Sequence, residues 1–539
     1  MSGFINIQKM KGYFILEIKY KNYIMNKLTR TKAATINSVV ASTAQLVQLI
    51  MQFISRSVFI NVLGAEFLGL NGLFLNLLGY LNFAELGLGA AITFSLFDPL
   101  VNDDKRQIAA IMNLFKKWYR YIALFVSVGG LILTPFVPQL INGGVSHLDI
   151  NVYIAFLLAL SNTVLSYLLT YKRTLLLADQ KGYINTLNTV GYNIAGQLLQ
   201  IATLYIFKNF YLFLVIQAVI MFVSNYHVSR VVDKLYPYLQ EYRQEKVSGK
   251  VIRYMKKNIS GMLSAKMGGI IVNGTDNLLL SYYIGLTSVA MYANYTMIIT
   301  GLTQVMGQLI SAVTSSIGNL GASKESQKKK EEVFYKYFYI SSLLSILVAV
   351  GFSAFSSTFV TLWLGNKMVY SFLPLLIISL NFVFQSLRQS VINYTNAYGI
   401  YWYARWKPIF ESLVNLVVSW TLVKYTDLGI SGVLIGTITS NLLVNVFWES
   451  WIVLHYGLKT KVRRFLYLYI SYIIGSAIVI FVTVYTVENF SGQKFVNGVL
   501  ISILAELAAF VMFMILNKIF YPKDLEAFSI VALLQRFKS

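Results

Sequence analysis

Fourteen long apolar segments follow one another along this chain of 539 residues, and they leave little room for any fold except a bundle of membrane-spanning helices. A bilayer core about 30 Å thick needs about 20 apolar residues per helix. The chain is 56% hydrophobic and 12% charged, whereas soluble domains carry about 25% charged residues. We therefore expect an all-α polytopic membrane protein with about 14 transmembrane helices.

The basic residues set the expected orientation and exclude one class of partner. Lys and Arg number 45 against 22 Asp and Glu, a net charge of +23. With the N-terminus inside, nearly all basic residues fall in the inner regions, and the outer loops hold Lys208, Lys367, Lys424 and Lys494. The positive-inside rule then predicts a multi-pass protein of the cell membrane with both termini cytoplasmic. The surplus charge indicates anionic membrane lipids as partners rather than nucleic acid.

An internal repeat divides the chain into two lobes. The stretch 62–71, around Gly64, matches 283–292, around Gly285, at an offset of 221 residues. Each copy holds six spans, an even number, so both copies enter the membrane from the same side and form a parallel repeat with a pseudo-twofold axis along the membrane normal. The predicted regions are a cytoplasmic N-terminal segment 1–36, an N-lobe 37–229 (spans 1–6), a cytoplasmic linker 230–257, a C-lobe 258–453 (spans 7–12), an appended helix pair 465–517 and a cytoplasmic amphipathic tail 518–539.

The sequence also predicts the structure of two segments of the N-lobe. Residues 67–97 form one apolar run, which we read as a single span. Residues 105–119 combine apolar side chains, among them Ile108 and Phe115, with lysines and an arginine on the opposite face. That pattern is typical of a helix lying in the plane of the lipid headgroups, and the alternative is that the segment simply pads the inner surface of the protein.

A stripe of polar residues runs down the first apolar helix and predicts a cavity. Gln45, Gln48, Gln52 and Arg56 fall within about 80° of one another at 100° per residue, on one face of the helix. At the offset of 221 residues the second copy places Lys266, Asn273 and Asn277 on the corresponding helix. A charge at the bilayer centre costs about 2.5 to 3.5 kcal/mol, so such residues need an aqueous interior to face. The predicted substrate-binding residues are Arg56, Gln45, Gln48, Gln52, Lys266, Asn273, Asn277 and Arg388.

The buried charged residues leave alternatives open. Arg56, Lys266 and Arg388 each lie within reach of a headgroup region, where a long basic side chain can extend to the membrane surface instead of a cavity. Asp276 and Glu85 are the predicted ion-coupling or gate residues, although Glu85 equally fits a hydrogen bond between packed helices. We expect Arg56 and Asp276 to approach each other when the outer side is closed; the alternative is that each pairs within its own lobe.

Several chemistries find no support in the sequence. The chain has no cysteine and three isolated histidines, so no metal site is predicted. It has no Gly-rich loop ending in Gly-Lys-Ser or Gly-Lys-Thr, so a P-loop nucleotide site is not expected. The short predicted outer loops do not suit a membrane glycosyltransferase or polymerase. We expect no enzyme activity and no cofactor, with a proton or sodium gradient as the candidate driving force.

Two runs of sequence resemble a known family. VLGAEFLGLNGLFLNLLGYLNFAELGLGAAITFSL, residues 62–96, and TDNLLLSYYIGLTSVAMYANYTMI, residues 275–298, resemble the Wzx-type polysaccharide flippases of Gram-positive bacteria, which belong to the multidrug, oligosaccharidyl-lipid and polysaccharide exporter superfamily. The resemblance implies a V-shaped transporter of two lobes. It also implies movement of undecaprenyl-pyrophosphate-linked oligosaccharide repeat units from the cytoplasmic to the outer leaflet by alternating access, for capsule or exopolysaccharide biosynthesis.

The buried charges agree with such a substrate. Three buried cations against two carboxylates favour an anion, and pyrophosphate is one. Two relatives within the superfamily remain alternatives: the peptidoglycan lipid II flippase, which also has fourteen spans, and the ion-coupled drug exporters, which typically have twelve. The resemblance further implies a polysaccharide polymerase and a chain-length regulator as partners.

Overall fold

The computed structural model describes residues 30–85, 88–141, 149–249, 274–322, 326–398, 400–490 and 495–521, and these residues form helices and short connections with no strand. Nine of the described helices are long and apolar enough to cross a membrane. The all-α, polytopic membrane fold class is therefore confirmed. The helices α8 and α12, which carry several amides and hydroxyls, are not among the nine, so the count of fourteen spans stays a prediction.

The first half of the chain forms one helical group, which we call the N-lobe. Its helices and 3-10 turns are α2 (Arg30–Leu63), α3 (Ala65–Leu81), η1 (Asn82–Glu85), α4 (Leu88–Val101), α5 (Lys105–Leu133), η2 (Thr134–Leu140), α6 (Val152–Tyr167), η3 (Thr170–Lys172), α7 (Arg173–Ala178), α8 (Gly182–Phe207) and α9 (Phe210–Leu235), followed by the short α10 (Tyr238–Glu241). Asparagine and aspartate side chains cap three of them: Asp104 begins α5, Asn151 begins α6 and Asn209 begins α9 by accepting hydrogen bonds from backbone N–H groups.

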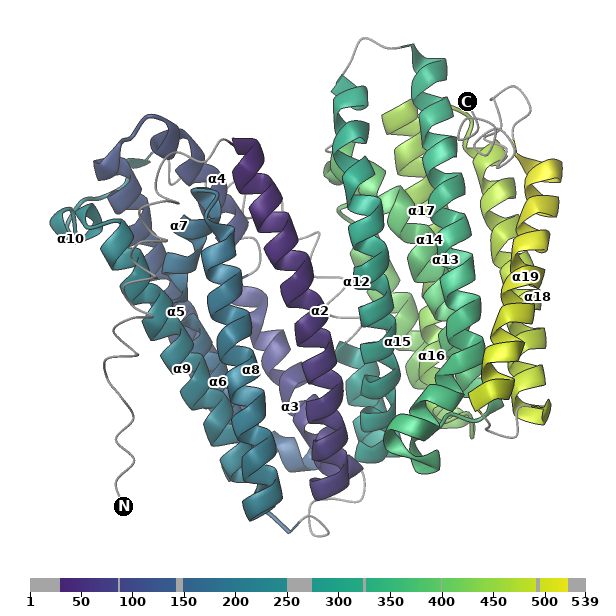
Figure 1. Cartoon of the computed structure of the whole chain (residues 1–539), viewed down its shortest axis with the longest axis horizontal. Helices are drawn as coiled ribbons and strands as arrows, with labels where there is room; N and C mark the ends of the chain where they lie inside the picture. The colour runs from purple at the N-terminus through teal and green to yellow at the C-terminus, as the bar shows by residue number, and fades with distance from the viewer. Residues whose placement is uncertain are drawn as a thin grey trace, which may run out of the picture.

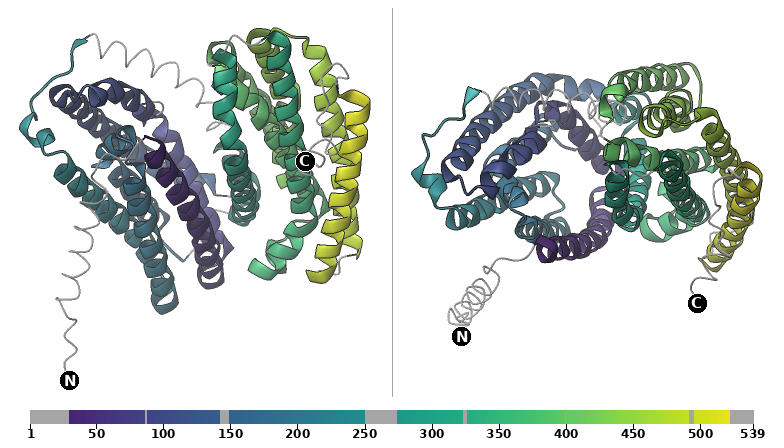
Figure 2. Two further views of the ribbon diagram at one scale, coloured as in Figure 1. Left: turned by 45° about the horizontal axis from the view of Figure 1, so that its top comes forward. Right: turned by 90° about the horizontal axis from the view of Figure 1, so that it is seen from above.

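The second half forms the C-lobe and a flanking pair of helices. The C-lobe contains helical residues 274–279, the π-turn η4 (Leu280–Ile284), α12 (Leu286–Ala322), α13 (Gln327–Leu364), η5 (Asn366–Met368), α14 (Phe372–Tyr398), η6 (Tyr401–Ala404), α15 (Lys407–Tyr425), α16 (Ile430–Ser440), the π-turn η7 (Asn441–Asn445), α17 (Val446–Trp451) and the π-turn η8 (Ile452–Leu458). The pair α18 (Val462–Phe490) and α19 (Phe495–Phe520) packs on α13 and α14, on the side of the C-lobe away from the N-lobe (Figures 1 and 2).

The two lobes lean together at one end and diverge at the other (Figure 1). The diverging end contains the first turn of α2, which the charge distribution predicts to be cytoplasmic. Each lobe has its own apolar core, with Phe74 and Phe156 fully buried in the N-lobe and Phe338 and Phe465 fully buried in the C-lobe. Two separate cores allow the lobes to move as units about the contacts between them.

The backbone has the same conformation at the two turns that the repeat aligns. Gly64 follows α2 with φ 94° and ψ 168°, and Gly285 follows η4 with φ 126° and ψ 169°. A positive φ costs glycine little, because it has no Cβ. The next helices then begin at Ala65 and Leu286, which are also 221 residues apart.

Two local readings of the sequence are wrong. The run 67–97 is not one span: α3 ends at Leu81, and the 3-10 turn η1 separates it from α4. Residues 105–119 do not form a separate interfacial helix but the first part of the continuous α5, and Ile108 and Phe115 are buried in the N-lobe core. The apolar face that resembled a membrane-surface helix is covered by neighbouring helices instead. The amphipathic tail lies outside the described residues, apart from its first few positions.

Candidate substrate cavity and buried charges

A cavity of about 630 Å³ lies between the lobes. Its walls come from α2, α3 and α8 of the N-lobe and from α12 and residue 277 of the C-lobe. The polar side chains that line it are Gln45, Gln48, Gln52, Arg56, Asn71, Asn76, Thr186, Thr189, Asn193, Asn277, Thr296, Thr300 and Gln304. Within the part of the chain that the structure describes, this lining contains no Asp or Glu.

The predicted stripe on the first helix faces this cavity. Gln45, Gln48, Gln52 and Arg56 all line it from α2, and Asn277 lines it from the other lobe. Lys266 and Asn273 lie outside the described residues. The positions therefore agree with the spacing of the sequence, whereas the role of these residues in binding a substrate stays a prediction.

Arg56 is the basic group of the described lining, and it contacts the opposite lobe. Its Nη1 donates a hydrogen bond to Oδ1 of Asn294, a fully buried residue of α12, over 3.1 Å. No carboxylate of the described residues forms an ion pair with the Arg56 guanidinium. A largely buried cation with a neutral partner retains an unbalanced positive charge. The site can therefore attract an anion entering the cavity.

Close contacts seal the lobes beyond the cavity, at the end away from the first turn of α2. Gly69 of α3 packs so tightly on α12 that a Cβ atom at this position would lie 1.9 Å from the backbone oxygen of Leu286. Ser281 Oγ donates to the backbone oxygen of Leu140 over 2.7 Å, and Trp363 Nε1 donates to the backbone oxygen of Phe53 over 3.1 Å. The lobes are therefore closed at this end, while their other ends diverge (Figure 1).

Asp276 lies inside the C-lobe and does not pair with Arg56. It is fully buried, and its Oδ2 accepts a hydrogen bond from Thr437 Oγ1 over 3.0 Å. Thr437 Oγ1 in turn accepts from Asn415 Nδ2 over 3.1 Å. Asp276 Oδ1 and Asn415 Oδ1 receive no hydrogen bond from the described residues. The predicted contact between Arg56 and Asp276 in the outward-closed state is wrong, because neighbouring residues of a helix point about 100° apart and Asn277 takes the cavity side.

Glu85 is a packing residue of the N-lobe. It lies in the 3-10 turn that separates α3 from α4, and its Oε1 accepts a hydrogen bond from the Tyr119 hydroxyl of α5. Nearby, the Tyr167 hydroxyl donates to Asn82 Oδ1 over 2.6 Å. These two tyrosines hold the 3-10 turn η1 against α5 and α6. Glu85 does not line the cavity between the lobes. The structure thus favours the helix-packing alternative for Glu85 over a gate role.

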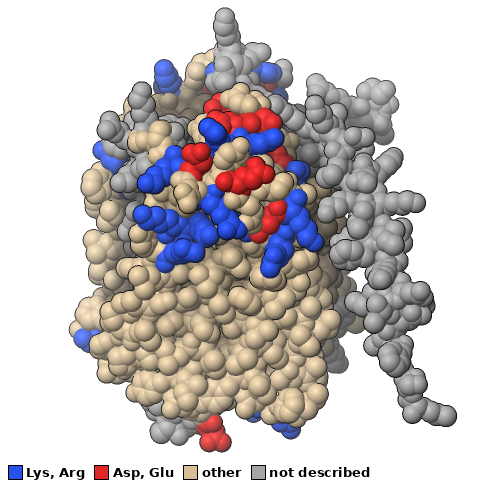
Figure 3. Space-filling view, turned by 90° about the vertical axis from the view of Figure 1, so that its left-hand side faces the viewer, with Lys and Arg blue, Asp and Glu red and all other residues tan. Residues whose placement is uncertain are grey.

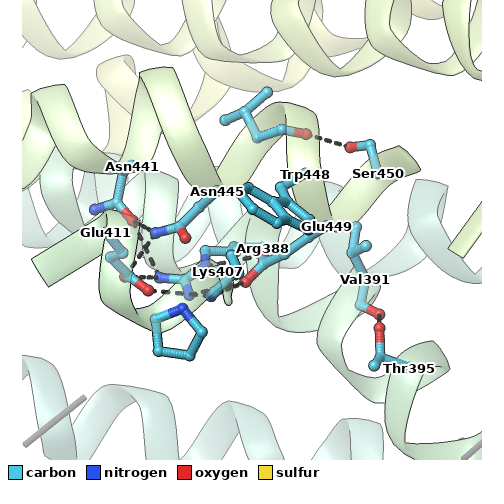
Figure 4. A network of polar contacts seen from close by, with 12 residues as sticks. Arg388, Val391, Thr395, Lys407, Glu411, Asn441, Asn445, Trp448, Glu449 and Ser450 are labelled. Atoms are coloured by element: carbon cyan, nitrogen blue, oxygen red, sulfur yellow. Dashed lines mark hydrogen bonds and ion pairs between the residues drawn. The ribbon is translucent and has the colours of Figure 1, made fainter. Parts of the chain in front are cut away.

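Arg388 belongs to a buried ion network of the C-lobe and does not line the cavity (Figure 4). Its guanidinium donates to Glu449 over 2.9 to 3.0 Å and lies 3.3 Å from Glu411 Oε1. Lys407 Nζ lies 2.6 Å from Glu449 and 3.1 Å from Glu411. Two cations and two carboxylates balance one another, so Arg388 has no free charge to offer a substrate. Its prediction as a cavity residue is wrong because two carboxylates from α15 and α17 neutralise it.

This network predicts a large effect on stability. Replacing Glu449 with alanine leaves Arg388 and Lys407 sharing the single carboxylate of Glu411, and removing one partner of a buried ion pair costs about 3 to 5 kcal/mol. We expect a clear fall in the melting temperature of the purified protein. Lys105→Ala is the control, because its contact with Asp103 is exposed to solvent, where such a pair is worth about 0 to 1 kcal/mol. Equal melting temperatures for the two variants would contradict the assignment.

Arg173 was not among the predicted site residues, and it lies behind the cavity wall. Its guanidinium donates to Asn185 and Thr189 of α8 over 2.7 Å each and to Ser224 and Asn225 of α9 over 2.9 and 3.0 Å. All of these partners are neutral. Thr189 also lines the cavity. Two adjacent basic residues at the end of a span, here Lys172 and Arg173, are typical of the positive charges that set the orientation of a membrane protein. Only the three-dimensional contacts show that Arg173 lies among polar side chains of α8 and α9. The residues Asn294, Asn415 and Thr437 were missed for a similar reason, since uncharged polar residues are common inside helix bundles.

Comparisons with known proteins agree with this architecture. Residues 211–373 match the model of a family described as polysaccharide biosynthesis protein. No curated protein matches the chain. Among solved structures, the chain is similar to the lipid II flippase MurJ in an inward closed conformation, with a TM-score of 0.61, 12% identity, and coverage of 90% of this chain and 99% of that one.

Two further structures show the same fold. A multidrug resistance MATE family transporter of the MOP superfamily in an inward-facing conformation gives a TM-score of 0.57 at 15% identity, covering 78% of this chain and 99% of that one. A MOP superfamily transporter from Pyrococcus furiosus gives a TM-score of 0.50 at 16% identity, covering 81% and 100%. The neighbours are transporters, not enzymes. The family match covers residues 211–373, and the chain as a whole shares the fold of these MOP superfamily transporters. Together with the nine long apolar helices of the described residues, this fold indicates a multi-pass membrane protein.

Proposed function

We propose that the protein translocates undecaprenyl-pyrophosphate-linked oligosaccharide repeat units from the cytoplasmic to the outer leaflet, for capsule or exopolysaccharide biosynthesis. The match to a polysaccharide biosynthesis family supports the class of product. The similarity to a protein named as a lipid II flippase supports a lipid-linked substrate. The lipid tail stays in the bilayer while the headgroup crosses through the cavity between the lobes.

One observation carries this proposal: the cavity offers Arg56 to an anion and, in its described lining, no carboxylate to repel one. A guanidinium binds phosphate oxygens in a bidentate manner, which suits a pyrophosphate. The amides of Gln45, Gln48 and Gln52 lie along the same wall and can exchange hydrogen bonds with sugar hydroxyls. A cationic drug, in contrast, would find no opposite charge in this lining.

Asp276 is the residue that we propose for coupling to a cation gradient. Its Oδ1 and the Oδ1 of Asn415 are buried acceptors without a donor among the described residues, and the Thr437 hydroxyl lies between the two side chains. A buried carboxylate that has hydroxyl or amide partners but no counter-charge is costly, so this group favours uptake of a proton or a sodium ion. Asp276 precedes Asn277, which lines the cavity, so the proposed coupling residue and the cavity wall share one helix.

Transport by the purified full chain in proteoliposomes tests the function. A fluorescent undecaprenyl-pyrophosphate oligosaccharide is placed in the bilayer, and its arrival at the opposite leaflet is followed by quenching with a membrane-impermeant reagent. We expect protein-dependent translocation of this substrate. Faster movement of lipid II would assign the chain to peptidoglycan synthesis instead. Transport of a cationic dye without movement of either lipid would overturn the proposal in favour of a drug exporter.

The coupling proposal has its own test. Asp276→Asn removes the charge but keeps the size of the side chain, and we expect stimulation of transport by a proton or sodium gradient to fall by at least about tenfold, within the usual range of coupling energies. Asp427→Asn is the control, because Asp427 is an exposed residue of a connection. The assay compares initial rates with and without the gradient at matched protein levels. Unchanged stimulation in Asp276→Asn would exclude this residue from coupling.

A further inference from the structure

A second cavity, of about 880 Å³, lies on the N-lobe between α5, η3, α9, α10 and Arg243. Among the described residues, it shares no lining residue with the cavity between the lobes. Six basic side chains line it: Lys116, Lys117, Arg120, Lys172, Arg230 and Arg243. Asp233 is the one carboxylate of its lining, and it lies 2.7 Å from Lys172 Nζ. Asp233 also lies near Lys116, so among the described lining residues one carboxylate faces six cations.

The positive groups converge on one space. Lys116 has Arg120, Lys172 and Arg243 as its charged neighbours of the same sign, although α5, η3 and the segment after α10 are far apart in the sequence. Asn113 of α5 fixes this arrangement, because its Nδ2 donates to the backbone oxygens of Tyr242 and Glu245 over 2.9 and 3.2 Å. Like charges held together in this way repel one another unless an anion lies between them. The cavity is thus built for an anion with several oxygen acceptors.

The helices that supply the cations become apolar directly beside the cavity. On α5, one face carries Arg120 and then the exposed Leu124 and Val128, and on α9 one face carries Arg230 and then the exposed Val223 and Val219. Figure 3 shows Lys and Arg, with Asp and Glu between them, gathered at one end of this side of the molecule, and Lys and Arg border a broad surface with few charges. This surface is the part of a membrane protein that contacts acyl chains.

Two tyrosines lie where the basic and apolar parts of the cavity meet. Tyr226 of α9 accepts hydrogen bonds from Arg230 over 2.7 and 3.0 Å, and Lys117 Nζ lies 5.9 Å from the ring of Tyr121 on α5. Both tyrosines are about half exposed and line the cavity. Tyrosine prefers the depth of the lipid headgroups, because its ring is apolar and its hydroxyl is polar.

We propose that this cavity binds the phosphate headgroup of an anionic phospholipid, with the acyl chains lying along the apolar faces of α5 and α9. Arg and Lys donate to the phosphate oxygens, and the neighbouring apolar faces select a lipid over a soluble phosphate. The site is separate from the transport pathway. A lipid held there bridges α5, α9 and the segment that leads into the linker between the lobes, so it ties the moving N-lobe to one leaflet.

Titration of the purified full chain with phosphatidylglycerol, followed by native mass spectrometry, tests the site. The double variant Lys116→Gln/Arg120→Gln is compared with Lys328→Gln/Lys329→Gln, which removes the same charge from exposed positions of α13. We expect the affinity for phosphatidylglycerol to fall by about 10- to 30-fold in the first variant and to stay nearly unchanged in the second. Phosphatidylcholine and glycerol 3-phosphate serve as the zwitterionic and the soluble probes.

Two more variants keep the test decisive. Arg243→Gln changes an exposed residue outside the long helices. This variant replaces the double variant if the double variant does not fold. Its affinity for phosphatidylglycerol should also fall. Asp233→Asn releases Lys172 from its ion pair and should raise the affinity for phosphatidylglycerol, a gain that damage to the fold would not produce. Equal losses in the α13 control, or unchanged affinity in both cavity variants, would overturn the proposal. Binding of glycerol 3-phosphate as tight as that of phosphatidylglycerol would identify a site for soluble phosphates instead.

Discussion

Replacing Arg56 with alanine is expected to reduce translocation of the pyrophosphate-linked substrate by at least about 30-fold, because a buried charge-assisted contact is worth about 2 to 5 kcal/mol. The guanidinium lines the cavity, and it donates a hydrogen bond to the neutral side chain of Asn294. Arg56→Lys keeps the charge but loses the bidentate geometry, so it should restore transport only in part. The measurement is the initial rate of translocation in proteoliposomes with equal amounts of protein.

Two controls separate substrate binding from closure of the lobes. Asn294→Ala removes the hydrogen bond across the lobes but leaves the cation, so we expect a smaller loss than for Arg56→Ala. Arg463→Ala removes an exposed arginine at the start of α18 and should leave transport unchanged. A loss in Asn294→Ala as large as that in Arg56→Ala would show that the contact between the lobes, rather than the charge, is required.

The polar stripe of α2 could be predicted from the sequence because helix geometry alone decides it. Residues 45, 48, 52 and 56 are three or four positions apart, so one face of any helix in this region carries all of them. That so polar a face lines a cavity follows from the cost of exposing it to lipid. The turn at Gly64 and Gly285 was predictable on similar grounds, since a tight positive-φ turn after a long apolar run favours glycine.

Arg388 shows where such reasoning ends. The helical periodicity around Arg388 does not predict its contact with Glu449, which is 61 positions away, or the nearby Lys407. The partner of a buried charge depends on how helices pack against one another, and periodicity within one helix does not reveal it. The same holds for Asp276 and Asn277. These two residues are adjacent in the sequence, yet the first lies inside the C-lobe and the second faces the cavity. The repeat shows how the two halves align, but it does not show which helices surround each side chain.

The contact between Gly69 and Leu286 gives the sharpest test of how the lobes close. Both helices approach so closely that even the methyl group of alanine would lie 1.9 Å from the Leu286 oxygen, so Gly69→Ala requires α3 and α12 to separate. Overpacking of this kind costs about 1 to 3 kcal/mol, which changes the balance between outward-closed and outward-open states by about 5- to 150-fold. Transport should fall because the closed state is reached less often.

The absence of cysteine from the chain makes this shift directly measurable. Spin labels at Lys208→Cys and Lys367→Cys, exposed residues of the two lobes at the ends of α8 and α13, report the distance between the lobes at their closed end. We expect longer distances in Gly69→Ala than in the parent. Gly79→Ala lies on the same helix and adds the same methyl group where no other atom lies within 4 Å, so it should leave the distances unchanged. Identical distance distributions for the two glycine variants would show that this close approach does not hold the lobes together, and closure would then depend on the contacts of Arg56, Ser281 and Trp363.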